Sequence, residues 1–440
     1  HLGGQLPRPL VAEGHLIGKF GAEQNDRFGA ERAILGGAEG EHIDAGAPGY
    51  VGRAARLNAF VERHHRIGKA RTVHMHFEIR AVRDSAKLGD LSHAIDRAGL
   101  AGLGKAEGSR LGGMDTEIIY GDDKRKPDVA KQLVNKMIKR DRVDFISGII
   151  WSNLLMAVHG PVTRSKTFLI SSNAGPSGVA GKKCSKDFFN VAFQNDMMPE
   201  GMGKYMTAKK ISNVYLMAPN YQAGKDMLKG FKRMFKGKIT GEVYTKLGQK
   251  DYQAEISALR AAKPSAVFVF LPGGMGINFV KQYAQAGLSS KIPLYSAYTV
   301  DAISLPALKD AAVGTFGVQH WSPDLGNSVN RRFVSDYRKK YGKTPPFYAA
   351  QAYDTVMFLD NAIRKAGGIG DREKLRAAMR VGDFPTTRGT FKFNNNHFPI
   401  QNIYLREAVK EADGSYVTKT RGVILSAHGD AYAKSCGMKW

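Results

Sequence analysis

The fold is decided by residues 143–177, which read VDFISGIIWSNLLMAVHGPVTRSKTFLISSNAGPS. Residues 143–149 and 167–171 are short apolar runs of strand length, rich in Ile and Phe. Ser152 and Asn153 follow the first run and are good helix caps. We therefore expect a strand, a helix and a second strand. Alternation of this kind builds parallel sheets that are covered by helices on both faces.

The same alternation continues on both sides of this stretch. Further strands are expected at residues 116–120, 213–218, 266–271 and 292–296. Helices are expected at residues 127–140, 199–209, 223–235, 252–262 and 276–286. After residues 315–320 the pattern changes to helices at 328–341, 348–366 and 372–379, and then to strands at 389–393, 403–409 and 416–424. So many strand–helix units exceed one small sheet, and we expect two α/β lobes with several chain crossings between them.

Length and charge limit the class of protein. A chain of 440 residues is too long for a single core. No run of about 18 apolar residues occurs, so we expect no membrane span. The formal net charge is +25, but the basic residues are scattered along helices such as 131–142. This pattern indicates a solvated basic surface that favours anionic ligands in general, and it does not favour nucleic acid as a partner.

Residues 1–113 differ in composition from the rest of the chain. They contain 12 Arg and 4 Lys, whereas the remainder contains 16 Arg and 33 Lys. One interpretation is a genuine, loosely ordered N-terminal extension. The other, which we favour, is that this stretch is not the natural reading frame of the gene. Only two segments have a regular pattern: residues 73–79 alternate as a strand does, and residues 87–100 place leucines near one helical face.

The two cysteines, Cys184 and Cys436, fit no metal-binding spacing. In an exported protein they would often pair, and in a cytosolic protein they would be buried thiols. The opening residues show neither a basic segment nor an apolar segment of the signal-peptide type, so this N-terminus gives no argument for export.

Ligands of open parallel sheets bind beyond the carboxyl ends of the strands. Five loops occupy such positions, at residues 148–153, 170–177, 218–224, 271–276 and 296–300. The first ends in Ser152 and Asn153, which leave helix N–H groups free for an anion or simply cap the helix. The second contains small residues that let backbone N–H groups approach a ligand. In the third, Tyr221 could cover an aromatic or aliphatic ligand.

Catalytic motifs are missing from the sequence. No G-x-G-x-x-G follows a strand, and neither a nucleophile elbow nor a phosphate-binding loop is present. His159, His397 and His428 are isolated from paired carboxylates and thiols. His320 lies between a strand and Trp321, so it could contact a ligand or hold the hinge. We expect no enzymatic activity, no cofactor and no metal site.

From about residue 111 onward, the chain resembles the periplasmic solute-binding proteins of ABC transporters, in the branched-chain-amino-acid (type I) class. The resemblance covers about three quarters of the chain. The stretches that carry it are KPDVAK at 126–131, TFLIS at 167–171, NAGPS at 173–177, APNYQAGKD at 218–226, residues 262–276, and NHFPIQ at 396–401.

The resemblance implies two Rossmann-like lobes with parallel sheets, joined by a hinge of three crossings. One lobe would hold residues 114–195 and 322–395, the other 196–321 and 396–424, with 425–440 as a tail. Cys436 in this tail could then reach Cys184. The protein would be a periplasmic, monomeric receptor that closes on a small organic acid or amino acid and delivers it to a membrane permease. The ligand-binding positions implied, with neighbours from the same loops, are Ser152, Asn153, Ser172, Asn173, Ala174, Gly175, Tyr221, Gln222, Ala223, Tyr298 and Tyr348.

Two departures from the family's pattern matter. Amino-acid binders of this family carry a carboxylate that pairs with the ligand's ammonium, and Tyr298 stands at that position here. An ammonium without a counter-charge would be costly to bury. We therefore expect an organic acid, plausibly aromatic, whose ring could stack on Tyr221, Tyr298, Tyr348 or Trp151.

The second departure concerns the family's first strand and its Ser-Gly-Pro-like turn, which nothing in residues 1–113 matches. Residues 73–79 and 87–100 could take that place, with Asp84 and Ser85 at the turn. Two other functions stay open: a cytosolic ligand-sensing regulator of the same fold, which a free thiol pair would favour, and an α/β enzyme, which would need a catalytic group that we do not find.

Overall fold

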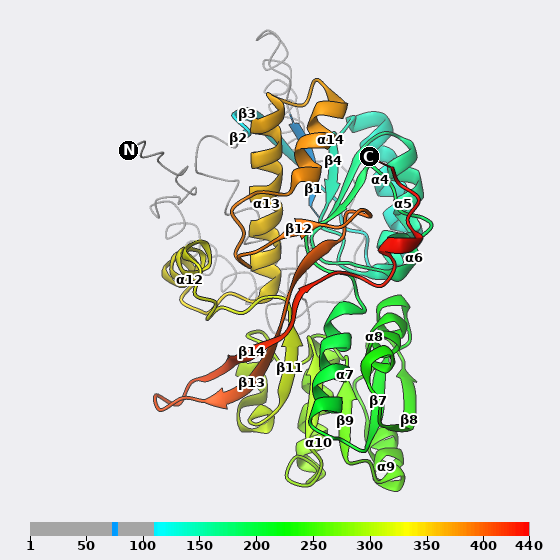
Figure 1. Cartoon of the computed structure of the whole chain (residues 1–440), viewed down its shortest axis with the longest axis vertical. Helices are drawn as coiled ribbons and strands as arrows, with labels where there is room; N and C mark the ends of the chain where they lie inside the picture. The colour runs from blue at the N-terminus through cyan, green and yellow to red at the C-terminus, as the bar shows by residue number, and fades with distance from the viewer. Residues whose placement is uncertain (1–72, 78–109, 440) are drawn as a thin grey trace, which may run out of the picture. The chain divides into compact units, whose positions relative to one another are not determined.

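The computed structural model describes residues 73–77 and 110–439 (Figure 1). All of these residues belong to one compact unit of the chain. The helix predicted at 87–100 and the turn at Asp84 and Ser85 lie outside the described residues. No helix in the described ranges combines the length and the apolar character needed to cross a bilayer.

The first group of strands comes from the N-terminal half of the chain. Strand β1 (Val73–Phe77) pairs in parallel with β3 (Met114–Tyr120), which also pairs with the short β2 (Arg110–Leu111). Strands β4 (Phe145–Ser147), β5 (Phe168–Ser171) and β6 (Phe188–Asn190) form a parallel sheet in that order. Because β1 also contacts β4, it lies between β3 and β4. The strand predicted at 73–79 is therefore confirmed over five residues.

Helices cover this group of strands on both faces. Helices α4 (Pro127–Lys136) and α5 (Ser152–Arg164) pack on one face through a core that contains Ile146. Helices α13 (Phe347–Ala366) and α14 (Arg372–Val381) pack on the other face through a core that contains Phe145. Neighbouring residues of one strand thus enter opposite cores, as the two-residue period of a strand requires.

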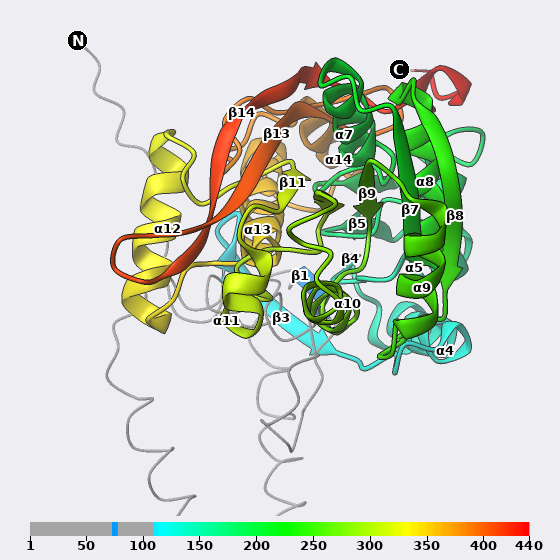
Figure 2. The same cartoon turned by 90° about the horizontal axis from the view of Figure 1, so that it is seen from below.

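The second sheet has eight strands in the order β12-β13-β11-β10-β9-β7-β8, with β14 paired to β13. Five of these strands run parallel to one another: β7 (Asn213–Pro219), β8 (Lys238–Thr245), β9 (Ala266–Val269), β10 (Leu294–Ala297) and β11 (Phe316–Gln319). Strands β12 (Lys392–Phe393), β13 (Pro399–Lys410) and β14 (Tyr416–His428) add antiparallel pairs. Figure 2 shows β13 and β14 as a long twisted ribbon beside β11.

Helices also cover both faces of the parallel part of this sheet. Helices α7 (Met197–Ala208) and α8 (Gln222–Met234) share one core with Leu216, and α9 (Gln253–Ala262) and α10 (Gly274–Gln285) share another with Met217. The short helices α6 (Ser177–Ala180) and α11 (Leu305–Leu308) and the longer α12 (Ser328–Tyr341) complete the fold. The expected α/β class with parallel sheets is confirmed.

The structure differs from the sequence-based prediction in a few elements. Strands β6 and β8 were not predicted. The helix expected at 127–140 is divided into α4 and a π-helical turn, Met137–Asp141, which ends at Arg142 in a left-handed conformation. Beyond β14 the tail contains a short 3-10 turn, Ala433–Ser435, and a disulfide joins Cys436 to Cys184 with 5.7 Å between their α-carbons.

Candidate functional site: a pocket at the strand ends

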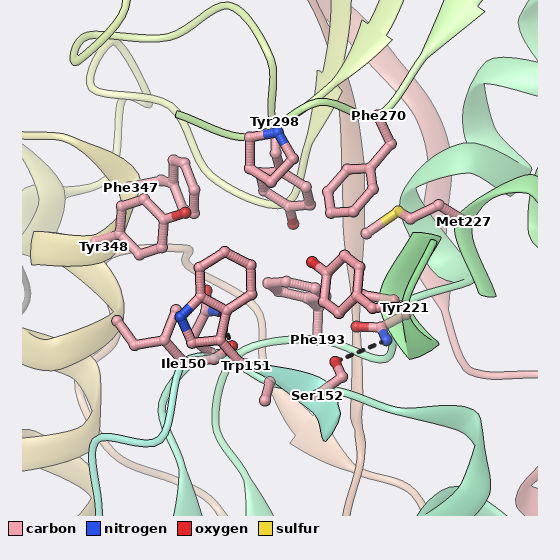
Figure 3. Close-up of a pocket in the computed structure, with 15 residues that line it drawn as sticks. Ile150, Trp151, Ser152, Phe193, Tyr221, Met227, Phe270, Tyr298, Phe347 and Tyr348 are labelled. Carbon is pink, nitrogen blue, oxygen red and sulfur yellow. Dashed lines mark hydrogen bonds between the residues drawn. The ribbon is translucent and has the colours of Figure 1, made fainter. Parts of the chain in front are cut away.

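A pocket lies where the carboxyl ends of strands from both sheets meet (Figure 3). It contains about 450 Å³ of empty space, part of it continuous with solvent. Loops after β4, β5 and β6 provide one wall, and loops after β7, β9 and β10 provide the other. The start of α13 closes one side. The pocket therefore occupies the position that the strand-end rule predicts for open α/β sheets.

Seven of the eleven predicted ligand-binding residues line this pocket: Ser152, Asn173, Ala174, Tyr221, Ala223, Tyr298 and Tyr348. Asn153, Ser172, Gly175 and Gln222 do not line it. Gly175 instead packs on the segment after β6, where an added Cβ would lie 1.9 Å from the carbonyl oxygen of Phe193. The side chain of Gln222 donates to Asp226, 2.8 Å away, on the same helix.

Two helix N-termini adjoin the pocket. Ser152 and Asn153 were expected to cap α5, but the cap position is Trp151, which provides no side-chain hydrogen bond. Helix α8 likewise begins after Tyr221 without a side-chain cap. Because the first N–H groups of a helix have no intrahelical partner and lie at the positive end of its dipole, both ends favour an anionic group.

The hydroxyl of Ser152 is oriented by a neighbour from the segment after β6. Asn195 Nδ2 donates to Ser152 Oγ at 3.1 Å, which Figure 3 shows as a dashed line. Since this bond occupies an acceptor position of the hydroxyl, Ser152 can give its own proton to a bound oxygen. Asn173 is held by a 3.0 Å bond from its Nδ2 to the carbonyl oxygen of Ile150.

Aromatic rings form most of the remaining wall. Trp151 and Tyr221 meet edge to face with centroids 5.6 Å apart, and Phe270 lies 6.4 Å beyond Tyr221. On the other side Phe193 stacks on Tyr298 at 4.9 Å. Flat apolar surfaces at these spacings suit a planar ring, which can stack or meet them edge-on.

Burial keeps the three tyrosines of the pocket protonated. Burial is the main cause that raises the pKa of Tyr221, Tyr298 and Tyr348 above the usual value for a phenol. Nearby Asp226 adds to the effect at Tyr221, and Asp301 adds to it at Tyr348. The tyrosines therefore offer neutral hydroxyls, each of which can donate or accept one hydrogen bond.

Tyr298 has an unusual backbone. Its φ is +53°, in the left-handed region that side chains other than Gly rarely adopt. Strain of this kind costs about 1–3 kcal/mol and is concentrated at functional sites. Tyr298 directly follows β10, and this backbone conformation directs its phenol into the pocket.

None of the lining residues carries a charge. In the described ranges, no group of three or more His, Cys, Asp or Glu side chains could hold a metal ion. What the pocket offers is two helix ends, a few hydroxyls and amides, and aromatic surface. That combination can hold a small planar anion.

Sequence reasoning missed several lining residues. Phe193 and Asn195 follow β6, whose three residues give too short a pattern to recognise as a strand. Phe270 lies inside the strand predicted at 266–271, and Phe347 lies one position before the predicted start of its helix. Ile150 and Pro272 lie in two of the five predicted loops but were not named as binding residues, and Met227 lies within α8. Trp151 was expected only as a stacking partner.

Comparison with known proteins gives one consistent family. A family model described as periplasmic binding protein matches residues 92–414. A relative from Brucella melitensis, described as Leu/Ile/Val-binding protein homolog 6, is 26% identical over 333 residues, which cover 73% of this chain and 85% of the relative.

Solved structures agree with this family. A solute-binding protein of an ABC transporter from R. palustris, in complex with benzoate, is 27% identical with a TM-score of 0.75, and the match covers 84% of this chain and 100% of that protein. A second, from Rhodopseudomonas palustris BisB5 in complex with 3,4-dihydroxybenzoic acid, is 27% identical with a TM-score of 0.72, over 81% of this chain and 98% of that protein.

Proposed function

Because the chain belongs to the periplasmic binding protein family, we propose that it is the receptor of an ABC importer for a small aromatic carboxylate. The family consists of substrate-binding proteins of ABC transporters. Both a benzoate-binding protein and proteins described as Leu/Ile/Val-binding are similar to this chain, so the choice between ligand classes depends on the pocket.

The observation that carries the proposal is the neutral pocket around Tyr298. Where the resemblance places a carboxylate for the ligand's ammonium, this chain has a protonated phenol, and no lining residue is acidic. Removing an ammonium from water without a counter-charge costs several kcal/mol. A carboxylate, by contrast, would meet the N-termini of α5 and α8 and the hydroxyl of Ser152.

We propose that the ligand is captured by closure of two lobes, residues 114–195 with 322–395 and residues 196–321 with 396–424. The pocket supports this division because its lining residues come from both sets. The binding residues proposed are Ser152, Asn173, Tyr221, Tyr298 and Tyr348, each of which lines the pocket. Closure of this kind would remove the ligand from water and present one shape to a permease.

The Cys184–Cys436 disulfide supports an extracytoplasmic, periplasmic location. Disulfides persist in oxidising compartments and are rare in the cytosol. A cytosolic ligand-sensing regulator of the same fold is therefore the less supported function.

Calorimetric titration of the full chain with benzoate, 3,4-dihydroxybenzoate and leucine tests the ligand class. We expect an aromatic acid to bind at least about 100-fold more tightly than leucine, since an unpaired buried ammonium costs several kcal/mol. Tyr298→Glu is the matched variant. Its carboxylate would repel an aromatic acid and provide a partner for an ammonium, so its preference should shift towards leucine. Tighter binding of leucine than of both aromatic acids by the unmodified chain would refute the proposal.

A further inference from the structure

A buried histidine lies behind the pocket and contacts two of its lining residues, Tyr298 and Phe193. The Tyr298 hydroxyl is 2.8 Å from His320 Nδ1. His320 follows β11, is 1% exposed and does not line the pocket. The ring of Phe193, which lines the pocket, lies 5.2 Å from the His320 ring and also stacks on Tyr298. Of these two contacts only the one with the Tyr298 hydroxyl is a hydrogen bond, so a polar influence of His320 on a ligand passes through that hydroxyl.

The second nitrogen of His320 faces the amide of Gln351 on α13. His320 Nε2 is 3.5 Å from Gln351 Nε2, and Gln351 is 2% exposed. An amide nitrogen can only donate, so an imidazole nitrogen that faces it must accept. Burial, with the charges of Arg388 and Arg406, lowers the pKa of His320 well below its usual value. The ring is therefore neutral and carries one proton, and with the Gln351 amide oriented as it is here that proton belongs on Nδ1.

A proton on Nδ1 fixes the direction of the bond to Tyr298. Nδ1–H then donates to the phenol oxygen, and the tyrosine's own O–H is free to point elsewhere. Tyr298 lines the pocket, and Figure 3 shows its ring among the aromatic side chains there. We propose that His320 is a positioning residue that makes Tyr298 a hydrogen-bond donor towards the ligand, so that the pocket selects acids with an acceptor oxygen at this point over acids with an ammonium.

Two buried arginines favour the same polarity. Arg388 and Arg406 are 4% exposed each, and their charge acts on Tyr298 in the direction that lowers its pKa, against the larger effect of burial. Arg388 is held by Asp354 at 2.9 Å, and Arg406 bonds to Gln319 behind Tyr298. A positive potential at the phenol stabilises an electron-rich oxygen next to it and disfavours an ammonium.

The inference rests on the proposed function, because it explains how that pocket chooses among carboxylates. Its matched probes are phenylpyruvate and L-phenylalanine. These acids share one carbon skeleton, and the first has a carbonyl oxygen where the second has an ammonium. The competing arrangement has the proton on Nε2, directed at Gln351 Oε1, and then Tyr298 would donate to His320 and turn lone pairs to the pocket.

Nitrogen-15 NMR of the histidine rings in the ligand-free chain separates the two arrangements. His320→Asn identifies the signals of His320 by their loss. We expect the one-bond coupling between nitrogen-15 and its proton to appear at Nδ1 of His320 at neutral pH. Protonation at Nε2 would overturn the inference, whatever ligand the protein binds.

Binding measurements then test the consequence. We expect the unmodified chain to prefer phenylpyruvate, and this preference to fall about tenfold in Tyr298→Phe and in His320→Leu, which is the range of one hydrogen bond. Because the two residues act through one bond, the double variant should show no further loss. His320→Asn keeps a donor near the Nδ1 position and should restore most of the preference.

The outcomes distinguish this inference from the function on which it rests. His320→Leu could lower the affinity for phenylpyruvate and for L-phenylalanine by the same factor, or the preference in the double variant could fall by the product of the two single factors. In either case His320 is structural only and the inference is wrong. If the unmodified chain binds leucine more tightly than both benzoate and 3,4-dihydroxybenzoate, the proposed function fails, while the NMR result still decides the role of His320. Thermal unfolding of each variant shows whether it is folded.

Discussion

His159 is a titratable group that the fold keeps neutral. It lies on α5, is 7% exposed and meets the ring of Phe188 edge to face at 5.3 Å. Burial, assisted by the charges of Lys183 and Arg164, lowers the pKa of His159 to about 4. The unfolded chain binds this proton with a pKa near 6.5. Protonation therefore favours the unfolded state, and stability present above pH 6.5 is lost as the pH falls towards 4.

His159→Phe should reduce the acid sensitivity of the protein. At pH 5 the native histidine stays largely neutral while the unfolded one is charged, which costs about 2 kcal/mol, from roughly 1.5 pH units at about 1.4 kcal/mol each. The phenyl ring keeps the contact with Phe188 and cannot titrate. Urea unfolding at pH 7.5 and at pH 5 should therefore show a smaller loss for the variant than for the unmodified chain. Equal losses would mean that His159 does not titrate on unfolding.

At the residue scale, the sequence predicts a loop of the pocket wherever that loop directly follows a recognisable strand. The loops that contain Ser152, Asn173 and Tyr298 were selected in this way, and the resemblance to the family then named these three residues, which line the pocket. Phe193 and Asn195 were not found, because they follow the three-residue β6. A local pattern does not show that Ser152 accepts a hydrogen bond from Asn195, which is distant in sequence. Nor does it show that the Gln222 side chain bonds to Asp226 and not to the pocket.

At the element scale, a buried carboxylate joins helices α6 and α8. Asp226 of α8 is 2% exposed and accepts from Ser177 of α6 twice, from N at 3.0 Å and from Oγ at 2.6 Å. It also accepts from Asn195 Nδ2 at 2.9 Å and from Gln222 Nε2 at 2.8 Å. Since Asn195 also holds Ser152, this network connects the joint between the two helices to the pocket wall.

Asp226→Asn should weaken ligand binding. The new amide nitrogen would face donors of Ser177, Asn195 or Gln222, so that at least one buried hydrogen bond is lost and two donors oppose each other. We expect the dissociation constant for benzoate to rise roughly 10- to 100-fold. Lys225→Gln, at an exposed neighbouring position of α8, is the matched control and should bind as the unmodified chain does. Unchanged benzoate affinity in Asp226→Asn would contradict a role for this network in binding.

The elements themselves were predictable where apolar runs were long or helical faces were clear. Strand β8 was not predicted because it is half exposed and contains Gly241, a residue that is uncommon in strands. The glycine is needed there, since an added Cβ would lie 2.3 Å from the Tyr215 ring. Helix α4 was predicted too long because Arg142, in a left-handed conformation, closes a π-helical turn that no propensity indicates. Strand β1 was recognisable from its alternation alone, although its pairing with β3 was not.

At the scale of the whole molecule, the tail connects distant segments. The disulfide joins Cys436 to Cys184, which are 252 residues apart in sequence. Between β14 and that cysteine, the Tyr432 hydroxyl donates to Asp196 Oδ2 at 2.7 Å, and Arg233 lies 5.6 Å from the Tyr432 ring centre. The class of fold and this pairing followed from the resemblance of the chain to its family. The contacts of Tyr432 did not, because they depend on how the last residues pack.

Removal of the disulfide should lower global stability more than any single surface contact. A cross-link that closes a loop of this length restricts the unfolded chain strongly, and loss of a native disulfide typically costs about 2–5 kcal/mol. We expect the double variant Cys184→Ser with Cys436→Ser to lose that much free energy of unfolding, and its urea midpoint should fall accordingly. The unmodified chain should match it after reduction, and reductant should leave the variant unchanged. Tyr432→Phe, which loses the bond to Asp196 and the longer one from Arg233, should cost about 1 kcal/mol. If reduction leaves the unfolding midpoint of the unmodified chain in place, the tail does not constrain the fold.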